Sequence, residues 1–326
     1  MDVPCLKLSA GNKIPILGLG TWQSKPGEVG NVVKSAIDAG YRHLDCAWFY
    51  QNEAEIGAAL KTKFQEGVVK REDMFITGKI WRTKMRYEDC LASLKNSLKS
   101  YDIEYLDLCL VHWPIPHQHD GNDELMPTDD KGDLVYSNTS YLETWKALEK
   151  AVDDGLVKAI GLSNFNSRQI DDVIRNGRIK PSVLQVEVHP YLSQEKLVKF
   201  CQERDIVVTA FSPFGSPDRP WATPDEPILL EDPQLLDIAK KYKKSSAQVI
   251  IRWLIQRNIV VVPKSANPAR IRENFNVWDF TLSEDDMAVI SSFNRDYRFI
   301  VFYKTVNGQR EFAEKDAPNF PFADEF

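Results

Sequence analysis

The stretch GYRHLDCAWFYQNEAEIGAALKTKF, residues 40–64, changes its hydrophobic period part-way along. Its first part, YRHLDCA, is a short run typical of a buried strand. Its later part, NEAEIGAALKTKF, spaces apolar residues as an amphipathic helix does. Asn52 followed by Glu55 resembles a capping box at the start of that helix, with Asn in place of Ser or Thr. The stretch therefore predicts one strand–helix unit.

The same alternation recurs along the whole chain. Short runs predict strands at ILGLGTW (16–22), YRHLDCA (41–47), MFITGKI (74–80), YLDLCLVHW (105–113), VKAIGLSN (157–164), VLQVEVH (183–189), IVVTAFSPF (206–214) and IVVVPKS (259–265). Amphipathic runs predict helices over 29–40, 52–64, 87–100, 141–155, 167–177, 194–205 and 245–257. Strict alternation of this kind predicts an α/β fold, a (β/α)8 barrel formed by residues 1–326 as a single domain. An open doubly wound sheet is the rival fold, because periodicity alone does not exclude it.

Several segments lie outside this alternation. Residues 1–15 predict a hairpin that turns at Ala10-Gly11-Asn12, and residues 298–326 predict an irregular, aromatic-rich tail. Loops 114–140 and 213–230, after the fourth and seventh strands, are rich in Pro, Asp and Gly. Loops of this length in a compact domain are often functional lids. We therefore expect them to cover a site.

Composition limits the classes of function. The chain has 326 residues, 43% hydrophobic and 27% charged, with a net charge of 41 − 47 = −6. A net negative charge argues against a protein that binds nucleic acids or anionic membranes in general. Five widely spaced cysteines without a CxxC pair favour a reducing, cytoplasmic setting. We expect no signal peptide and no membrane span, since no apolar run approaches the ~20 residues that a span needs.

Four polar residues lie at or just beyond consecutive strand ends. Asp45 ends the second predicted strand, Tyr50 follows it, Lys79 ends the third and His112 ends the fourth. Barrel enzymes place their reacting residues at the C-terminal strand ends, so these side chains should converge. We call them the strand-end cluster.

The chemistry of the strand-end cluster is coherent. A carboxylate beside apolar surface is costly unless it is paired, and Lys79 can pair with Asp45. A nearby ammonium should lower the pKa of Tyr50 below its usual value of about 10, so that Tyr50 can donate a proton to a substrate oxygen. His112 could orient that oxygen. Each residue alone has a commoner structural explanation, as an ion pair, a rim tyrosine or a core histidine. Their convergence favours function.

Other motifs are weaker. Gln23 stands where a dinucleotide fingerprint after Gly18 and Gly20 would need its third glycine. No Walker loop, GxSxG elbow, HExxH motif or YxxxK pair occurs. A metal hypothesis rests on three residues of one polar, irregular segment, His117, His119 and Asp120, and we predict no metal. A phosphate site after the eighth strand is more promising, on Lys264, Ser265 and Arg270.

The motifs along the chain resemble those of a known family. GYRHLDCAWFYQNE, ITGKIW, LVHWP, GLSNFN, QVEVHPYL, FSPFGSPDRPWA and VVPKS with RIRENF make the chain similar to the aldo-keto reductases, near the aldose and aldehyde reductase group. The resemblance implies an NADPH-dependent (NADP+-forming) oxidoreductase that reduces aldehydes, and also ketones or sugars, to alcohols. It implies Tyr50 as general acid, Lys79 held by Asp45 as modulator of its pKa, and His112 as the residue that orients the carbonyl. We expect a cytoplasmic monomer whose partner is a small carbonyl substrate.

The resemblance also implies binding residues. Those for the cofactor are Thr21, Trp22, Asp45, Ser163, Asn164, Gln185, Phe211, Ser212, Phe214, Ser216, Asp218, Lys264, Ser265, Arg270, Glu273 and Asn274. Those for the substrate are Trp22, Phe49, Trp81, His112, Trp113 and Trp221. A wall of Trp and Phe favours apolar or aromatic aldehydes. Trp253, on a predicted helix, is expected to be a packing residue.

Departures from the family lie at Gln23, at Trp48 and Phe49, at Met126, and in the tail. Gln23 replaces a lysine that helps to latch the loop over the cofactor, so NADPH should leave faster. Trp48, Phe49 and the tail are expected to set which carbonyl is reduced.

Two rival functions remain open. The first is a binding or structural protein that keeps the barrel and the cofactor. The second is a Schiff-base aldolase that uses Lys79, against which the charged partner Asp45 argues, because it keeps the lysine protonated.

Overall fold

Eight parallel strands form the centre of the molecule. The computed structural model describes residues 3–119, 121, 123–301, 303–306, 309–324 and 326. The strands are β3 (Leu19–Gly20), β4 (His43–Asp45), β5 (Phe75–Ile80), β6 (Leu108–Val111), β7 (Ile160–Ser163), β8 (Val183–Glu187), β9 (Val207–Phe211) and β10 (Val260–Val261). They pair in chain order from β3 to β10. Parallel bridges from Leu17 to Val261 and from Gly20 to Lys264 join the first strand to the last. The sheet is therefore a closed barrel, and the open-sheet alternative is wrong.

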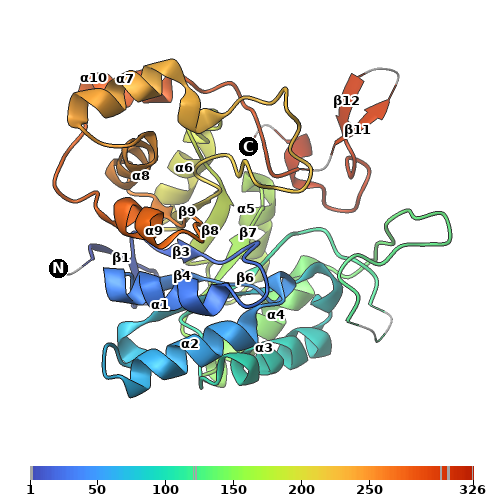
Figure 1. The fold of residues 1–326 in the computed structure, drawn as a ribbon. Helices are drawn as coiled ribbons and strands as arrows, with labels where there is room; N and C mark the ends of the chain where they lie inside the picture. Colours follow the sequence, from blue (N-terminus) through green and yellow to red (C-terminus); the bar gives the residue numbers. More distant parts are fainter. Residues whose placement is uncertain (1–2, 120, 122, 302, 307–308, 325) are drawn as a thin grey trace.

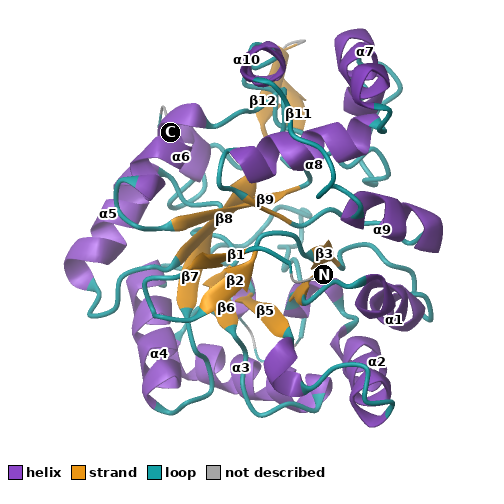
Figure 2. Cartoon of the chain, turned by 90° about the vertical axis from the view of Figure 1, so that its left-hand side faces the viewer, coloured by secondary structure: helices purple, strands orange, loops and turns teal. Residues whose placement is uncertain are grey.

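Helices surround the strands on the outside (Figure 2). They are α1 (Val29–Ala39), α2 (Glu53–Gln65), α3 (Tyr87–Tyr101), α4 (Tyr141–Asp153), α5 (Ser167–Asn176), α6 (Glu195–Gln202), α7 (Pro233–Tyr242), α8 (Ser246–Gln256), α9 (Pro268–Phe275) and α10 (Glu284–Ser291). All seven helices predicted from periodicity are present. To these seven the structure adds α7, α9 and α10, whose side-chain caps Asp232, Asn267 and Ser283 accept hydrogen bonds from the first turn. In the described residues, no helix is both long and apolar enough to cross a membrane.

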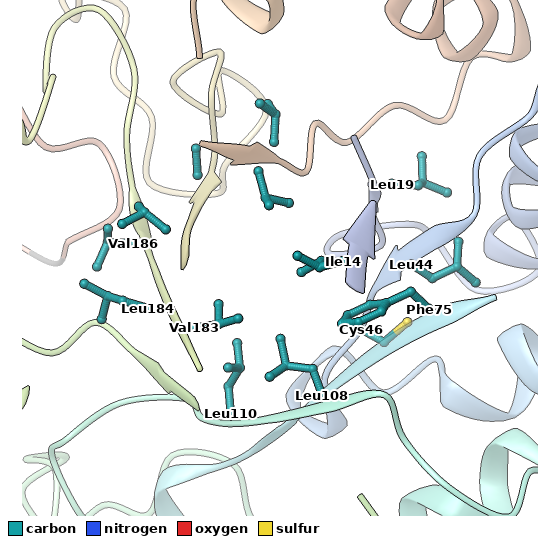
Figure 3. Packing of buried hydrophobic residues seen from close by; sticks show 14 of the residues in the cluster. Ile14, Leu19, Leu44, Cys46, Phe75, Leu108, Leu110, Val183, Leu184 and Val186 are labelled. Carbon is teal, nitrogen blue, oxygen red and sulfur yellow. The ribbon is translucent and has the colours of Figure 1, made fainter. Parts of the chain in front are cut away.

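Apolar side chains fill the barrel and the layer beneath the helices (Figure 3). Every residue of β5, β6, β7 and β8 is buried, which explains why these strands are apolar at consecutive positions. Leu44 and Leu110 have no exposed surface, and each such side chain stabilises the fold by roughly 1.5–3 kcal/mol. Trp253 is also fully buried, which confirms its packing role.

The predicted N-terminal hairpin is present, and it closes one end of the barrel. It consists of β1 (Cys5–Lys7) and β2 (Lys13–Pro15), paired antiparallel. Leu8 and Ile14 of this segment are buried, and Ser9 shares a hydrogen bond of 2.9 Å with Ser182 next to β8. The opposite end, where the strands terminate, is left for the long loops. In Figure 1, loop 114–140 and the C-terminal hairpin project on the same side.

Two local predictions are wrong. Asn52 precedes α2 but makes no side-chain cap; its amide donates to Thr21 O at 2.9 Å, while Glu55 accepts from Gly27 N at 3.0 Å. A tertiary contact has replaced the local one. The C-terminal tail is also more regular than predicted, since it contains a hairpin of β11 (Tyr303–Val306) and β12 (Gln309–Phe312).

Close packing of α2 on the end of α3 gives a stability prediction. A Cβ on Gly57 would lie 2.6 Å from Ser100 O and 2.7 Å from Tyr101 O, both backbone atoms that cannot move freely. Gly57→Ala should therefore lower the free energy of unfolding by roughly 1–3 kcal/mol in urea titrations. Gly30→Ala is the matched control, because its Cβ would meet Glu55 O at an ordinary 3.6 Å and gain helix propensity. Equal effects of the two substitutions would contradict this packing argument.

Candidate active site

The strand-end cluster converges at the open end of the barrel. Asp45 ends β4, Lys79 is the last residue but one of β5, and His112 directly follows β6. Tyr50 lies in the short 3-10 turn Trp48–Tyr50. Lys79 Nζ lies 2.7 Å from Asp45 Oδ1 and 3.2 Å from the Tyr50 hydroxyl. The rings of Tyr50 and His112 are 5.9 Å apart in an edge-on arrangement. The sequence prediction of one converging site is therefore supported by the geometry.

Lys79 is a buried cation with an opposite charge beside it. Its side chain has no exposed surface, and it also donates to Cys46 O at 2.9 Å. Burial opposes its charge, but Asp45 and Tyr50 outweigh burial and raise the pKa of Lys79 above its ordinary value. Asp45 accepts a second hydrogen bond from Gln185 Nε2 at 2.8 Å, which fixes the carboxylate. Lys79 therefore stays protonated at neutral pH.

The pKa of Tyr50 differs from our expectation. Burial raises the pKa of Tyr50 to about 12, although Lys79 acts in the opposite direction. We predicted a net lowering from the ammonium alone, and this was wrong because the sequence does not reveal how much water the cluster excludes. The phenol therefore holds its proton at neutral pH, and Lys79 limits rather than reverses the effect of burial.

His112 is a neutral imidazole. Burial, followed by the charges of Lys79 and Arg82, lowers the pKa of His112 well below its ordinary value. Its Nδ1 is buried with no hydrogen-bond partner in the described residues. Its ring lies edge-on to Trp81 at 5.1 Å, and Asn164 Nδ2 donates to its backbone carbonyl at 2.9 Å. These contacts position a neutral ring N–H donor beside Tyr50.

A large cavity opens above the strand-end cluster, with an empty volume of about 1550 Å³ that includes open solvent. All six residues predicted to contact substrate line it: Trp22, Phe49, Trp81, His112, Trp113 and Trp221. Phe49 stacks on Trp81 with centroids 3.8 Å apart. Trp48 is not among the described lining residues and instead places its ring 5.3 Å from Lys84 Nζ.

Most residues predicted to hold the cofactor line the same cavity. They are Trp22, Asp45, Asn164, Gln185, Phe211, Ser212, Phe214, Ser216, Asp218 and Lys264. Ser212 and Ser216 share a hydrogen bond of 2.8 Å, and both have positive φ, so the loop after β9 is sharply folded. Thr21 and Ser163 are buried, next in sequence to residues that line the cavity. Ser265 lies between β10 and α9, and Arg270, Glu273 and Asn274 lie on α9, none of them among the described lining residues.

Sequence reasoning missed the residues that hold the tail against the barrel. Glu187, at the end of β8, accepts hydrogen bonds from Phe299 N at 2.7 Å and Ile300 N at 3.1 Å. Further along, Glu314 pairs with Arg82, which follows β5. Both Ile300 and Glu314 line the cavity. In the sequence, Glu187 and Arg82 could be recognised only as charged residues next to strand ends. That position does not show that each contacts the tail, more than a hundred residues away.

The metal hypothesis finds no support in the described residues, where no cluster of three or more potential ligands occurs. His119 Nε2 lies 3.8 Å from Asp89, and His117 Nε2 lies 3.8 Å from Glu314. Asp120, the third residue of the hypothesis, lies outside the described residues.

Comparison with known proteins decides the family. Residues 16–295 match the sequence model of the Aldo/keto reductase family. The chain belongs to this family. The aldo-keto reductase family 1 member A1 of Gallus gallus is 52% identical over 321 residues, covering 97% of this chain and 96% of that protein. Its Homo sapiens counterpart is 48% identical over the full length of both. This reductase is therefore related to enzymes of the aldehyde reductase group.

A solved structure agrees with the fold. The aldose reductase of Schistosoma japonicum superposes on this reductase with a TM-score of 0.89 and 44% identity, covering 99% of this chain and 100% of that one. The barrel with an N-terminal hairpin is thus the aldose reductase fold. Family membership supports an oxidoreductase that acts on carbonyl compounds.

Proposed function

We propose that this reductase converts aldehydes, and ketones or sugars in the same way, to alcohols with NADPH. One observation carries the proposal: the protonated Tyr50 hydroxyl, the Lys79 cation and the neutral His112 ring meet at the base of one large cavity. An acid, a charge that stabilises its conjugate base and a hydrogen-bond donor are what the reduction of a carbonyl oxygen requires.

The residues present fit a nicotinamide dinucleotide. Amide side chains of Asn164 and Gln185 face the cavity beside Asp45 and suit a carboxamide. The ring of Phe211 offers a stacking surface, and the folded loop after β9 can cover a pyrophosphate. Lys264, with Ser265 and Arg270 following it, suits the extra phosphate of NADPH and so favours NADPH over NADH. A bound NADPH would supply the hydride to the carbonyl carbon.

The protein groups act on the carbonyl oxygen. His112 donates a ring hydrogen bond that orients the oxygen, and Tyr50 gives it a proton. Lys79 then stabilises the phenolate that remains, and Asp45 keeps Lys79 charged and in place. The apolar wall of Trp and Phe excludes water and strengthens each of these interactions. Because burial already holds Tyr50 protonated, no rearrangement of protons is needed before reduction.

The rival functions are less well supported. A Schiff base needs an uncharged amine, and the pKa of Lys79 is raised with Asp45 at 2.7 Å. A structural protein would not need the full strand-end cluster, although a second role beside catalysis is compatible with it.

The proposal is tested by initial rates with NADPH and with NADH on aldehydes, ketones, sugars and steroids. We expect NADPH to be preferred and aromatic aldehydes to be reduced fastest. Equal rates with NADH would overturn the phosphate assignment, and no reduction of any carbonyl would overturn the function.

A second prediction concerns cofactor release. Gln23 lines the cavity with Asp218 and Lys264, where the family resemblance implies a latch lysine. Gln23→Lys should restore a charge opposite Asp218 and slow the release of NADPH by roughly 2–5-fold, the effect of a partly exposed ion pair. Stopped-flow fluorescence measures that release rate. Gln65→Lys, on the exposed end of α2, is the control. An unchanged release rate in Gln23→Lys would contradict the latch hypothesis.

A further inference from the structure

A buried ion pair forms part of the cavity wall. Arg82, in the 3-10 turn Arg82–Lys84 after β5, faces Glu314 of the tail. Arg82 Nη2 lies 2.5 Å from Glu314 Oε1 and Nη1 lies 3.2 Å from Oε2, a two-point contact. Only 2% of the arginine side chain and 11% of the glutamate side chain are exposed. Both residues line the cavity, so this pair borders the space that substrate would occupy.

The remaining bonds of the pair are internal. Arg82 Nε donates to Ile115 O at 3.0 Å, and the Tyr136 hydroxyl donates to Glu314 Oε1 at 3.2 Å. Burial opposes the charge of Glu314, but His117 and Arg82 outweigh it and hold the pKa of Glu314 at about 2. The glutamate is therefore ionised at neutral pH, and it neutralises Arg82.

Among the described residues that line the cavity, Arg82 is the one basic side chain at this end, while Arg298 lies outside the lining, 4.0 Å over the ring of Phe322. The neighbouring lining residues in the described part of the chain are apolar: Ile115, Phe312, Phe320 and Phe322. Two further basic side chains line the cavity elsewhere. Arg219 pairs with Glu226, and Lys264, one of the residues predicted to hold the cofactor, forms a β-bridge with Gly20. A substrate carboxylate that entered near the tail would be desolvated without a cation to pair with, because Arg82 already pairs with Glu314.

We propose that Glu314 determines substrate charge: by occupying Arg82, it makes the tail side of the cavity accept uncharged aldehydes and exclude carboxylate-bearing ones. The proposal rests on the proposed function for the identity of the substrate. The exclusion of carboxylates depends only on binding to the cavity and not on the chemical step. Removing Glu314 should expose the guanidinium, whose geometry suits a carboxylate.

The experiment compares two aldehydes of similar shape, 4-carboxybenzaldehyde and its methyl ester, in the complete enzyme with NADPH. Wild type should favour the ester in kcat/KM. Glu314→Ala should shift the acid-to-ester ratio toward the acid by roughly 10–100-fold, the value of a hydrogen-bonded charge. Glu314→Gln, which keeps the volume of the side chain, should shift the ratio in the same direction. Glu311→Ala, which breaks the nearby Glu311–Lys315 pair in the same tail, is the matched control and should leave the ratio unchanged.

A second readout does not depend on turnover. Binding of benzoate and of benzamide is followed by tryptophan fluorescence, since Trp81 and Trp113 line the cavity. Glu314→Ala should gain affinity for benzoate alone, and Arg82→Met combined with Glu314→Ala should lose that gain. Failure of wild type to reduce the ester would count against the proposed function, while the binding data would still decide the role of Glu314. An unchanged ratio, a gain that survives loss of Arg82, or unfolding of both Glu314 variants would overturn the inference.

Discussion

Tyr50→Phe should lower kcat roughly 100- to 10,000-fold while NADPH still binds with wild-type affinity, the range expected for loss of a general acid. The substitution removes a hydroxyl 3.2 Å from Lys79 Nζ and keeps the ring that packs beside His112. Burial holds the proton on Tyr50, with its pKa at about 12, so the hydroxyl is available as an acid across the neutral range. The measurements are steady-state turnover of an aromatic aldehyde and a fluorescence titration with NADPH.

The matched control is Tyr105→Phe. The Tyr105 ring lies against the side chains of Arg71 and Lys158. Tyr105 precedes β6 and therefore lies at the end of the barrel away from the cavity. Turnover of this variant should equal that of wild type. Wild-type-like turnover in Tyr50→Phe would show that the proton comes from elsewhere and would overturn the mechanism.

Lys79→Met should abolish turnover to a similar extent and also destabilise the protein. Without the cation, the pKa of Tyr50 rises further, and the phenolate left by proton transfer has no stabilising charge. Asp45 becomes a buried carboxylate with only the Gln185 hydrogen bond left, which should lower the free energy of unfolding by roughly 3–5 kcal/mol. Urea unfolding and steady-state turnover measure the two effects separately.

A double variant separates chemistry from folding. Asp45→Asn combined with Lys79→Met removes both charges, so the cost of an unpaired buried carboxylate disappears. Stability should return to within about 1–2 kcal/mol of wild type while turnover stays lost. Recovery of turnover together with stability would contradict the role given to Lys79, because the lysine would then serve only the fold.

Most of the barrel could be predicted from the sequence, because each strand and helix is indicated by the hydrophobic pattern of its own residues. Strands such as β6 and β8 are buried on both faces and so are apolar at consecutive positions. The strand-end cluster followed from the barrel itself, since neighbouring parallel strands end at the same rim. Local reasoning therefore located Asp45, Lys79 and His112 before any contact was known.

What could not be predicted depends on contacts between distant parts of the chain. Asn52 has the sequence context of a helix cap, yet its amide binds Thr21 O from another loop. The raised pKa of Tyr50 depends on the water that the surrounding residues exclude. Arg82 and Glu314 are 232 positions apart, so no spacing rule connects them. Each of these features has to be observed in the folded protein.

The most direct test of the central claim is a mass analysis of the alcohol formed from benzaldehyde and NADPH deuterated at the transferred position. We expect one equivalent of benzyl alcohol per NADPH consumed, with deuterium on the former carbonyl carbon. We also expect Tyr50→Phe to form this product only at its greatly reduced rate. Consumption of NADPH without alcohol, or alcohol that carries no deuterium, would contradict the account.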